Sequence, residues 1–471
     1  MDKEPDKMQE GNEFQQVLKR YREMIERKVS YFFDVEEYEE IIDYYLDIRD
    51  FLLAREAVGI ALVQHPGSYE LLVKQVHIHL ESGKPVLALE TLDELPEYER
   101  DNSEFFLLKG TALAHLGKVR EAERMFDAAL EKSDDDEAET LINISIAFEN
   151  VRHYRLAVKY LRLAYEKDHY NITVLYDLGY YYERLHNYQL SEKFYNRYLD
   201  IDPFSENVWY NLGVVYYKIN KTEKSLEAYD YAIAVNPSYA SAYFNKANIF
   251  ANNKDYLKAI RVYEDFLDLE PDNVQGWCYL GECYEETGHY GKALDIYKKV
   301  IRIDNAWPDG WYGAGIAMMY LKHYREASTY LLKAIEFDKD NSEFWFTLAE
   351  NYEKDGKLDE AIKSYKQVTL LDRDDREAWI RLAFVYINNL EFEKSLVVLR
   401  DAYQHNFSSQ DITYMLSAVY YRLHDETAGL RFLEKAVELG EGALKIFFRI
   451  YPDGKDNENI KSIINKDQKS K

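Results

Sequence analysis

The feature that most constrains the fold is a match of the chain to itself at an interval of 34 residues. Twelve units follow one another, and only the third needs an extra residue. They span residues 35–68, 69–102, 103–137, 138–171, 172–205, 206–239, 240–273, 274–307, 308–341, 342–375, 376–409 and 410–443. Self-similarity at this period is typical of stacked structural repeats, so a length of 471 residues does not imply several separate globular domains.

Two helices per unit are predicted by the residues that recur in it. Unit 206–239 has apolar or small residues at its positions 4, 7, 8 and 11, which is the spacing of one helix face, and positions 20, 24 and 27 repeat that spacing. Small residues at positions 8 and 20 let two helix backbones approach closely, so each unit is predicted to be a helical hairpin. Position 20 is small in every unit: Ala54, Ala88, Ala122, Ala157, Ser191, Ser225, Ala259, Ala293, Ala327, Ala361, Ser395 and Gly429.

The recurring motif W-x2-L-G-x2-Y … A-x3-F … P resembles that of the tetratricopeptide repeat. Its first part stands in the chain as Trp209, Leu212, Gly213 and Tyr216, and Pro237 closes the same unit. Five of the six tryptophans occupy position 4: Trp209, Trp277, Trp311, Trp345 and Trp379. The resemblance covers residues 35–443 and implies an all-α superhelix (solenoid) of about twelve repeats.

The two ends are expected to cap this array. Residues 1–11 are polar and expected to be disordered, and apolar residues at helical spacing predict a capping helix near 12–30 within the starting segment 1–34. Residues 444–471 should form a closing helix, from the run ALKIFFRIY, and a polar tail. The apolar stripe of either end could instead pair with a second copy of the chain, which would make a homodimer through the termini.

Composition excludes several classes of partner. The net charge is 59 − 85 = −26, so the chain repels polyanions and nucleic-acid binding is not expected. A basic protein or peptide is the natural electrostatic complement, although the charge could serve solubility alone. No apolar run approaches the length of a membrane span, and Cys278 and Cys283 suggest neither a disulfide framework nor a zinc site. These features favour a cytoplasmic protein without membrane insertion.

No catalytic chemistry is predicted. His77 and His79 are two residues apart on a helix and point away from each other, so a shared metal is not expected and both are interpreted as surface or packing residues. The chain has no glycine-rich phosphate loop, nucleophile elbow or H-E-x-x-H motif. We therefore expect a non-enzymatic protein without a metal or another cofactor.

The resemblance implies that the first helices line a concave groove that binds extended peptides or partner helices. Positions 2, 5, 6, 9, 12 and 13 should face this groove, because the apolar positions point into the stack. Amides spaced one repeat apart carry donors and an acceptor for a ligand's main chain, and tyrosines add contact area. The candidate groove residues are Asn143, Tyr176, Asp177, Tyr180, Asn207, Tyr210, Asn211, Tyr217, Lys218, Phe244, Asn245, Asn248 and Tyr279. Alternatively, the amides bond across adjacent first helices or to water.

The sequence thus predicts a protein-interaction scaffold that holds a peptide or partner helix in its central groove, at units four to eight. Two alternatives remain open at this point. One is a structural homo-oligomer that assembles through its terminal helices. The other is a regulatory subunit of an enzyme complex.

Overall fold

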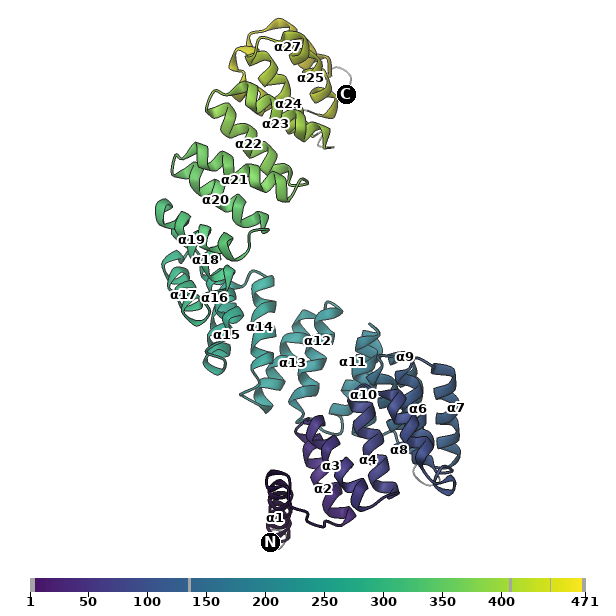
Figure 1. Ribbon diagram of the computed structural model, residues 1–471. Coiled ribbons are helices and arrows are strands. Elements are labelled where there is room, and N and C mark those ends of the chain that lie inside the picture. Colours follow the sequence, from purple (N-terminus) through teal and green to yellow (C-terminus); the bar gives the residue numbers. More distant parts are fainter. Residues whose placement is uncertain (1–4, 134–136, 406–408, 441, 468–471) are drawn as a thin grey trace. The chain divides into compact units, whose positions relative to one another are not determined.

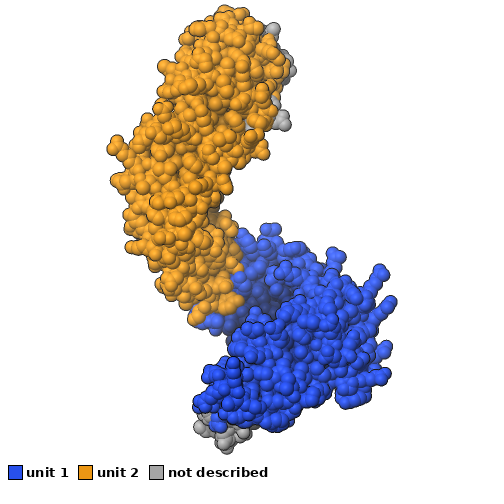
Figure 2. Space-filling view, viewed as in Figure 1, with its two compact units in different colours: residues 1–237 blue, residues 238–471 orange. Residues whose placement is uncertain are grey.

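The structure, a computed structural model, describes residues 5–133, 137–405, 409–440 and 442–467. These residues form α-helices joined by turns and two short 3-10 helices, and they contain no strand. The chain divides into two compact units, residues 1–237 and 238–471 (Figure 2). The fold is therefore all-α, as the sequence predicts.

The first unit contains an N-terminal helix and six helical hairpins (Figure 1). The N-terminal helix is α1 (Pro5–Arg27). The first helices of the hairpins are α2 (Val35–Asp47), α4 (Tyr69–Glu81), α6 (Ser103–His115), α8 (Glu137–Asn150), α10 (Ile172–Arg184) and α12 (Glu206–Lys218). The second helices are α3 (Phe51–Gln64), α5 (Pro85–Glu94), α7 (Val119–Glu131), α9 (Tyr154–Lys167), α11 (Tyr188–Leu199) and α13 (Thr222–Val235), and the 3-10 helix Glu97–Glu99 follows α5.

The second unit contains six further hairpins and a helical end (Figure 1). Its first helices are α14 (Ala240–Asn252), α16 (Val274–Glu286), α18 (Pro308–Tyr320), α20 (Ser342–Lys354), α22 (Arg376–Asn388) and α24 (Gln410–Arg422). Its second helices are α15 (Tyr256–Leu269), α17 (Tyr290–Ile303), α19 (Tyr324–Phe337), α21 (Leu358–Leu371), α23 (Phe392–Gln404) and α25 (Glu426–Leu439). Helices α26 (Leu444–Ile450) and α27 (Glu458–Asp467) complete it, with the 3-10 helix Pro452–Lys455 between them.

The turn inside each hairpin has the same geometry in all twelve repeats. Its fifteenth residue has a positive φ, and the next residue donates a backbone hydrogen bond to the carbonyl of position 11, as Asp50 N does to Tyr45 O at 2.8 Å. This bond is the mark of a Schellman cap, which ends a helix by satisfying its last carbonyls. The residues with positive φ are Arg49, Gly83, Gly117, Arg152, His186, Asn220, Lys254, Gly288, Lys322, Gly356, Leu390 and His424.

The two helices of a hairpin meet at the small residues of positions 8 and 20. A Cβ built on Gly179 would lie 2.6 Å from the ring of Tyr195, which occupies position 24, so glycine is needed for this close approach. The hydroxyl of Ser191, at position 20, donates to the carbonyl of Gly179 at 2.7 Å. Gly213 and Ser225 repeat both contacts in the next hairpin. The expected close contact of the two helices is confirmed.

Tryptophan recurs at position 4 because its indole N–H fastens the first helix to the turn before it. The Nε1 atom of Trp209 donates to the carbonyl oxygen of Pro203 at 2.8 Å. The four other tryptophans at this position make the same bond to the residue six places earlier, at 2.8–3.1 Å. This bond satisfies a carbonyl of the connection between repeats, while the ring lies against the second helix of its own hairpin, as Trp209 does against Tyr231.

Helix α1 packs against the first hairpin. Val17, Leu18, Tyr21 and Met24 are buried, and the Tyr21 ring contacts those of Phe33, Tyr38 and Tyr45. The helix begins at Pro5, earlier than the sequence suggested, so residues 5–11 form its first turns rather than a disordered start. Residues 1–4, which belong to the same expectation, lie outside the described residues.

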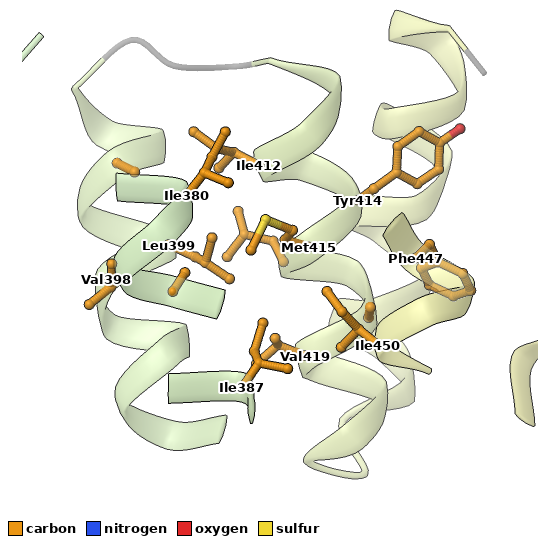
Figure 3. Close-up of a cluster of buried hydrophobic side chains, with 14 of the residues drawn as sticks. Ile380, Ile387, Val398, Leu399, Ile412, Tyr414, Met415, Val419, Phe447 and Ile450 are labelled. Atoms are coloured by element: carbon orange, nitrogen blue, oxygen red, sulfur yellow. The ribbon is translucent and has the colours of Figure 1, made fainter. Parts of the chain in front are cut away.

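The C-terminal end covers the last hairpin. Phe447 and Ile450 of α26 are buried against α24, within a cluster that extends back to α20 (Figure 3). Ile460 of α27 is fully buried as well. The apolar run after residue 443 is therefore used inside the chain, and the end of the predicted polar tail, 468–471, lies outside the described residues.

Candidate functional site

First helices of the first unit line a cleft of about 500 Å³, which we call the α4–α8 cleft. Its residues come from α4, α6 and α8, and almost all of them occupy the repeat positions expected to face a groove. They are His77, Leu80, Glu81, Glu104, Leu107, Leu108, Thr111, His115, Asn143, Ile146, Ala147 and Asn150. Since second helices contribute none of these residues, the cleft belongs to the first-helix face of the stack.

A second hollow, of about 630 Å³, adjoins this cleft. It lies over α2, the start of α3 and α4, and it shares His77 and Glu81 with the α4–α8 cleft. The two hollows are therefore adjacent, and together they lie over four successive first helices, α2, α4, α6 and α8. An extended chain could follow them from one repeat to the next.

The α4–α8 cleft combines an apolar wall with polar groups that have no internal partner. Ile146 of α8 is 40% exposed although it is a large aliphatic residue. The amides of Asn143 and Asn150 form no hydrogen bond within the described part of the chain. Loss of hydration in the cleft lowers the pKa of His77 and of His115, so both imidazoles are neutral at pH 7. Apolar area with a few unused polar groups is typical of a binding surface.

The charges along this face are mainly negative. Lys74 is paired with Asp43, its Nζ lying 2.6 and 2.8 Å from the two carboxylate oxygens. Burial, with the neighbouring carboxylates, raises the pKa of Glu39 despite Lys74. Glu104 accepts a hydrogen bond from the Tyr69 hydroxyl at 2.7 Å, whereas Glu81 forms no ion pair with any residue that the structure describes.

The sequence-predicted residues of the first unit continue the same face from α8 onto α10 and α12. Asn143 lines the cleft, as stated above. Tyr176, Asp177 and Tyr180 lie on α10, and the other five lie on α12: Asn207, Tyr210, Asn211, Tyr217 and Lys218. Burial raises the pKa of Asp177 to about 6, with a smaller contribution from Glu149. The guanidinium of Arg184 lies over the Tyr180 ring and donates to its hydroxyl at 2.9 Å.

One residue of the predicted amide series, Asn211, forms a hydrogen bond within the protein. The Nδ2 atom of Asn211 donates to the Tyr176 hydroxyl at 3.3 Å, from one first helix to the adjacent one. Tyr312 and Thr347 make the equivalent bond between α18 and α20, at 3.0 Å. A bond between positions 5 and 6 of successive repeats is therefore a packing device of this stack, and at Asn211 it supports the alternative that amides bond across adjacent helices.

The remaining four predicted residues belong to the second unit. Phe244, Asn245 and Asn248 lie on α14, and Tyr279 lies on α16. Asn248 accepts a hydrogen bond from the Tyr263 hydroxyl at 2.5 Å, and the Phe244 ring packs between second-helix aromatics and Tyr279. Phe244 and Asn248 therefore have partners inside the hairpin stack.

Sequence reasoning missed most of the α4–α8 cleft. Glu81, His115 and Asn150 all occupy position 13, and Ile146 occupies position 9, so each stands at a position already assigned to the groove. Tyrosines and repeated amides, the residues that predicted a groove, are concentrated in later repeats instead. A usable signal was present: a large aliphatic residue at a groove position, flanked by polar groups.

No metal-binding group is present among the described residues, in the sense of three or more clustered His, Cys, Asp or Glu side chains. His79 is buried in the hairpin core, where it takes the position 11 that aromatic residues hold in most repeats. Cys278 and Cys283 are buried free thiols. Within the described ranges, no helix is long and apolar enough to cross a membrane.

Comparison with protein families identifies the repeats. Tetratricopeptide-repeat models match residues 73–138, 172–205 and 206–239, the last two with the boundaries of the fifth and sixth units. The chain belongs to the tetratricopeptide-repeat family. A further model, described as the C-terminal domain of cilia and flagella-associated protein 70, matches residues 234–446 of this tetratricopeptide-repeat array.

Solved structures similar to this tetratricopeptide-repeat chain share little of its sequence. The C-terminal part of a repeat-containing protein from Cytophaga hutchinsonii is 17% identical, covers 50% of this chain and 97% of its own, and gives a TM-score of 0.45. A tetratricopeptide-repeat protein from Parabacteroides merdae is 16% identical over 53% of this chain and 98% of its own, with a TM-score of 0.39. YrrB, described as a repeat protein with an unusual peptide-binding site, is 16% identical over 39% of this chain and 95% of its own, with a TM-score of 0.35. No curated protein matched the sequence.

Proposed function

We propose that this tetratricopeptide-repeat protein is a non-enzymatic scaffold that binds an extended peptide or a partner helix along the first-helix face of its first unit. The observation that supports this most strongly is the pair of adjacent hollows over α2, α4, α6 and α8. A partner laid along them would cover the exposed Ile146 and reach the unused amides of Asn143 and Asn150. Apolar contact would supply affinity, and the amides would fix the path of the bound main chain.

The candidate residues on α10 and α12 extend this surface. Tyr217, which is 38% exposed, and the exposed Lys218 offer contacts to a longer ligand. Asn211 already has a partner in Tyr176, so we assign it a smaller share of binding than Asn143. The proposed groove thus lies mainly on the first four repeats, whereas the sequence predicted it at repeats four to eight.

Terminal pairing of two copies receives less support as a primary function. The apolar residues of α1, α26 and α27 that it would use are buried against the chain's own hairpins. A regulatory subunit of an enzyme complex would use the same first-helix face, with the bound segment supplied by the enzyme. The free thiols of Cys278 and Cys283 suit a reducing compartment, which supports a cytoplasmic location.

The test uses the full chain and a random library of phage-displayed dodecapeptides. Ile146→Asp places a charge on the apolar wall of the cleft, and Leu163→Asp is its matched control, because Leu163 is also 40% exposed but lies on the second helix of the same repeat. We expect selected peptides, remade with a fluorescent label, to bind Ile146→Asp at least about tenfold more weakly. This corresponds to a loss of about 1.4 kcal/mol in binding free energy. Binding to Leu163→Asp should match wild type. Equal binding to all three proteins would place the ligand elsewhere.

A further inference from the structure

One end of the α4–α8 cleft is formed by the last residues of three adjacent first helices. Glu81 ends α4, His115 ends α6 and Asn150 ends α8, and all three line the cleft. Each is position 13 of its repeat. The carbonyl groups of helix C-termini carry a partial negative charge, so this end of the cleft attracts a cation even before its side chains are considered.

Glu81 stands against local preference at this place. A carboxylate on the last turn of a helix is repelled by the negative end of the helix dipole, and cationic side chains are preferred there. No residue in the described part of the chain neutralises it through an ion pair. His115 is close enough to interact electrostatically with Glu81, but its imidazole is neutral at pH 7 because burial lowers its pKa. A residue that breaks a local rule without an internal compensation is often retained for binding.

The surroundings indicate which kind of cation this end of the cleft could bind. Ile146 of α8 lines the same cleft as Glu81 of α4, so a metal ion or a small ammonium ion at Glu81 would leave this apolar residue uncovered. A peptide that carries lysine or arginine near an apolar residue can satisfy both surfaces at once. Asn150, whose amide has no internal partner among the described residues, can accept from either head group.

We propose that the position-13 end of the α4–α8 cleft binds a lysine or arginine side chain of the partner peptide at Glu81, while an apolar residue of the same peptide covers Ile146. This inference rests on the proposed function and specifies the chemistry of its partner. The adjoining hollow adds little attraction of its own, because its Asp43 and Asp47 are matched by Lys74 and Arg49. Glu81 therefore carries the charge recognition.

The experiment uses the peptides selected above, with fluorescence anisotropy at pH 7.5. We expect them to contain lysine or arginine beside an apolar residue, and Glu81→Gln to weaken their binding about tenfold, since a hydrogen-bonded charge contributes a factor of this size. Glu94→Gln is the matched control: Glu94 also ends a helix and is exposed in the same repeat, but on the second-helix face. It separates local recognition from the general attraction that a net charge of −26 exerts on any basic peptide.

A peptide whose basic residue is replaced by glutamine should bind wild type and Glu81→Gln equally, because the partner of the carboxylate is then gone. Peptides that depend on Ile146 but carry no basic residue, or ignore Glu81→Gln, would overturn this inference and leave the proposed function standing. Peptides that do not depend on Ile146 at all would overturn both. Circular dichroism on each variant shows whether folding is retained.

Discussion

Two first helices of the same repeat design, α6 and α24, face different surroundings. Helix α6 buries one side against its hairpin partner and leaves Leu107, Thr111 and His115 on the α4–α8 cleft. Helix α24 is buried on all sides: every residue from Ile412 to Tyr421 is buried. The equivalent positions of a repeat can thus form either a binding surface or a sealed core.

The difference comes from what covers the first-helix face. Helix α26 packs on α24, where the Phe447 ring lies 5.9 Å from that of Tyr421, and Tyr451, which follows α26, stacks on Tyr421 at 5.1 Å. The central groove positions of α24, which are positions 5, 6, 9 and 12, are accordingly apolar or aromatic: Tyr414, Met415, Ala418 and Tyr421. Around the α4–α8 cleft they include charged and amide residues instead. The polarity of these positions therefore records whether a repeat is open or closed.

Removing the cover should have the largest effect. Phe447→Ala deletes a fully buried ring between α26 and α24, and we expect a loss of about 3–5 kcal/mol in the local stability of the last repeat. Hydrogen exchange of α24 should rise toward that of α6. Phe337→Ala is the control: its side chain is 45% exposed and lies in the same half of the chain, residues 238–471. It should change the hydrogen exchange of α24 little. Unchanged protection of α24 in Phe447→Ala would show that the covering helix is not what seals this repeat.

A second difference between open and sealed repeats concerns their small residues. In the last hairpin the usual pair is inverted: Ser417 stands at position 8 and donates to the carbonyl of Gly429, at position 20. A Cβ on Gly429 would lie 2.8 Å from the Tyr421 ring, so Gly429→Ala should cost about 1–3 kcal/mol by overpacking.

The matched change in an uncovered hairpin should cost less. Ser225→Ala, at the same repeat position, removes only the hydrogen bond to Gly213 and should cost about 1 kcal/mol. Urea unfolding of the two variants, followed by circular dichroism, measures the difference. A smaller loss in Gly429→Ala than in Ser225→Ala would mean that Tyr421 moves aside without cost, and that the sealed repeat is less tightly packed than its burial indicates.

The repeat and its register could be predicted from the sequence because they depend on residues that recur. Position 20 reports helix contact in every unit, and the tryptophans at position 4 report a bond to the preceding turn. The left-handed backbone conformation at position 15 could be predicted in only some repeats. Glycine occupies this position in four repeats, and residues such as Arg49 and Leu390 occupy it elsewhere. Sequence preference identifies such a position only where glycine or asparagine is used.

The candidate site was less predictable because it depends on differences between repeats. Periodicity predicted which repeat positions lie on the first-helix face, and Asn143 lines the α4–α8 cleft on that face. It could not show that Asn211 bonds to Tyr176 or that Asn248 bonds to Tyr263, because those bonds depend on distances between neighbouring helices. Nor could it show where side chains leave a hollow, since hollows depend on the sizes of residues from several repeats together.

The smallest predicted effect is a pH response at position 11, where the open region has His79 and the sealed repeat has Tyr420. His79 is only 8% exposed and its Nδ1 atom is buried without a hydrogen-bond partner. Burial, and then Lys84 and Arg55, lower the pKa of this imidazole below the value of about 6.5 that it has in an unfolded chain.

The folded protein therefore binds fewer protons than the unfolded chain when the pH is below about 6.5. The stability of α4 should be complete above that pH and fall as the solution becomes more acidic, by at most about 1.4 kcal/mol per pH unit. Hydrogen exchange at pH 7.5 and 5.5, expressed as protection factors, should show α4 weakening relative to α24. His79→Phe, which installs the ring that Phe148 and Phe250 supply at the same position, should abolish this relative change. If α4 in His79→Phe still weakens as much as in wild type, the response arises elsewhere on the open face, where His77 and His115 are the next groups to replace.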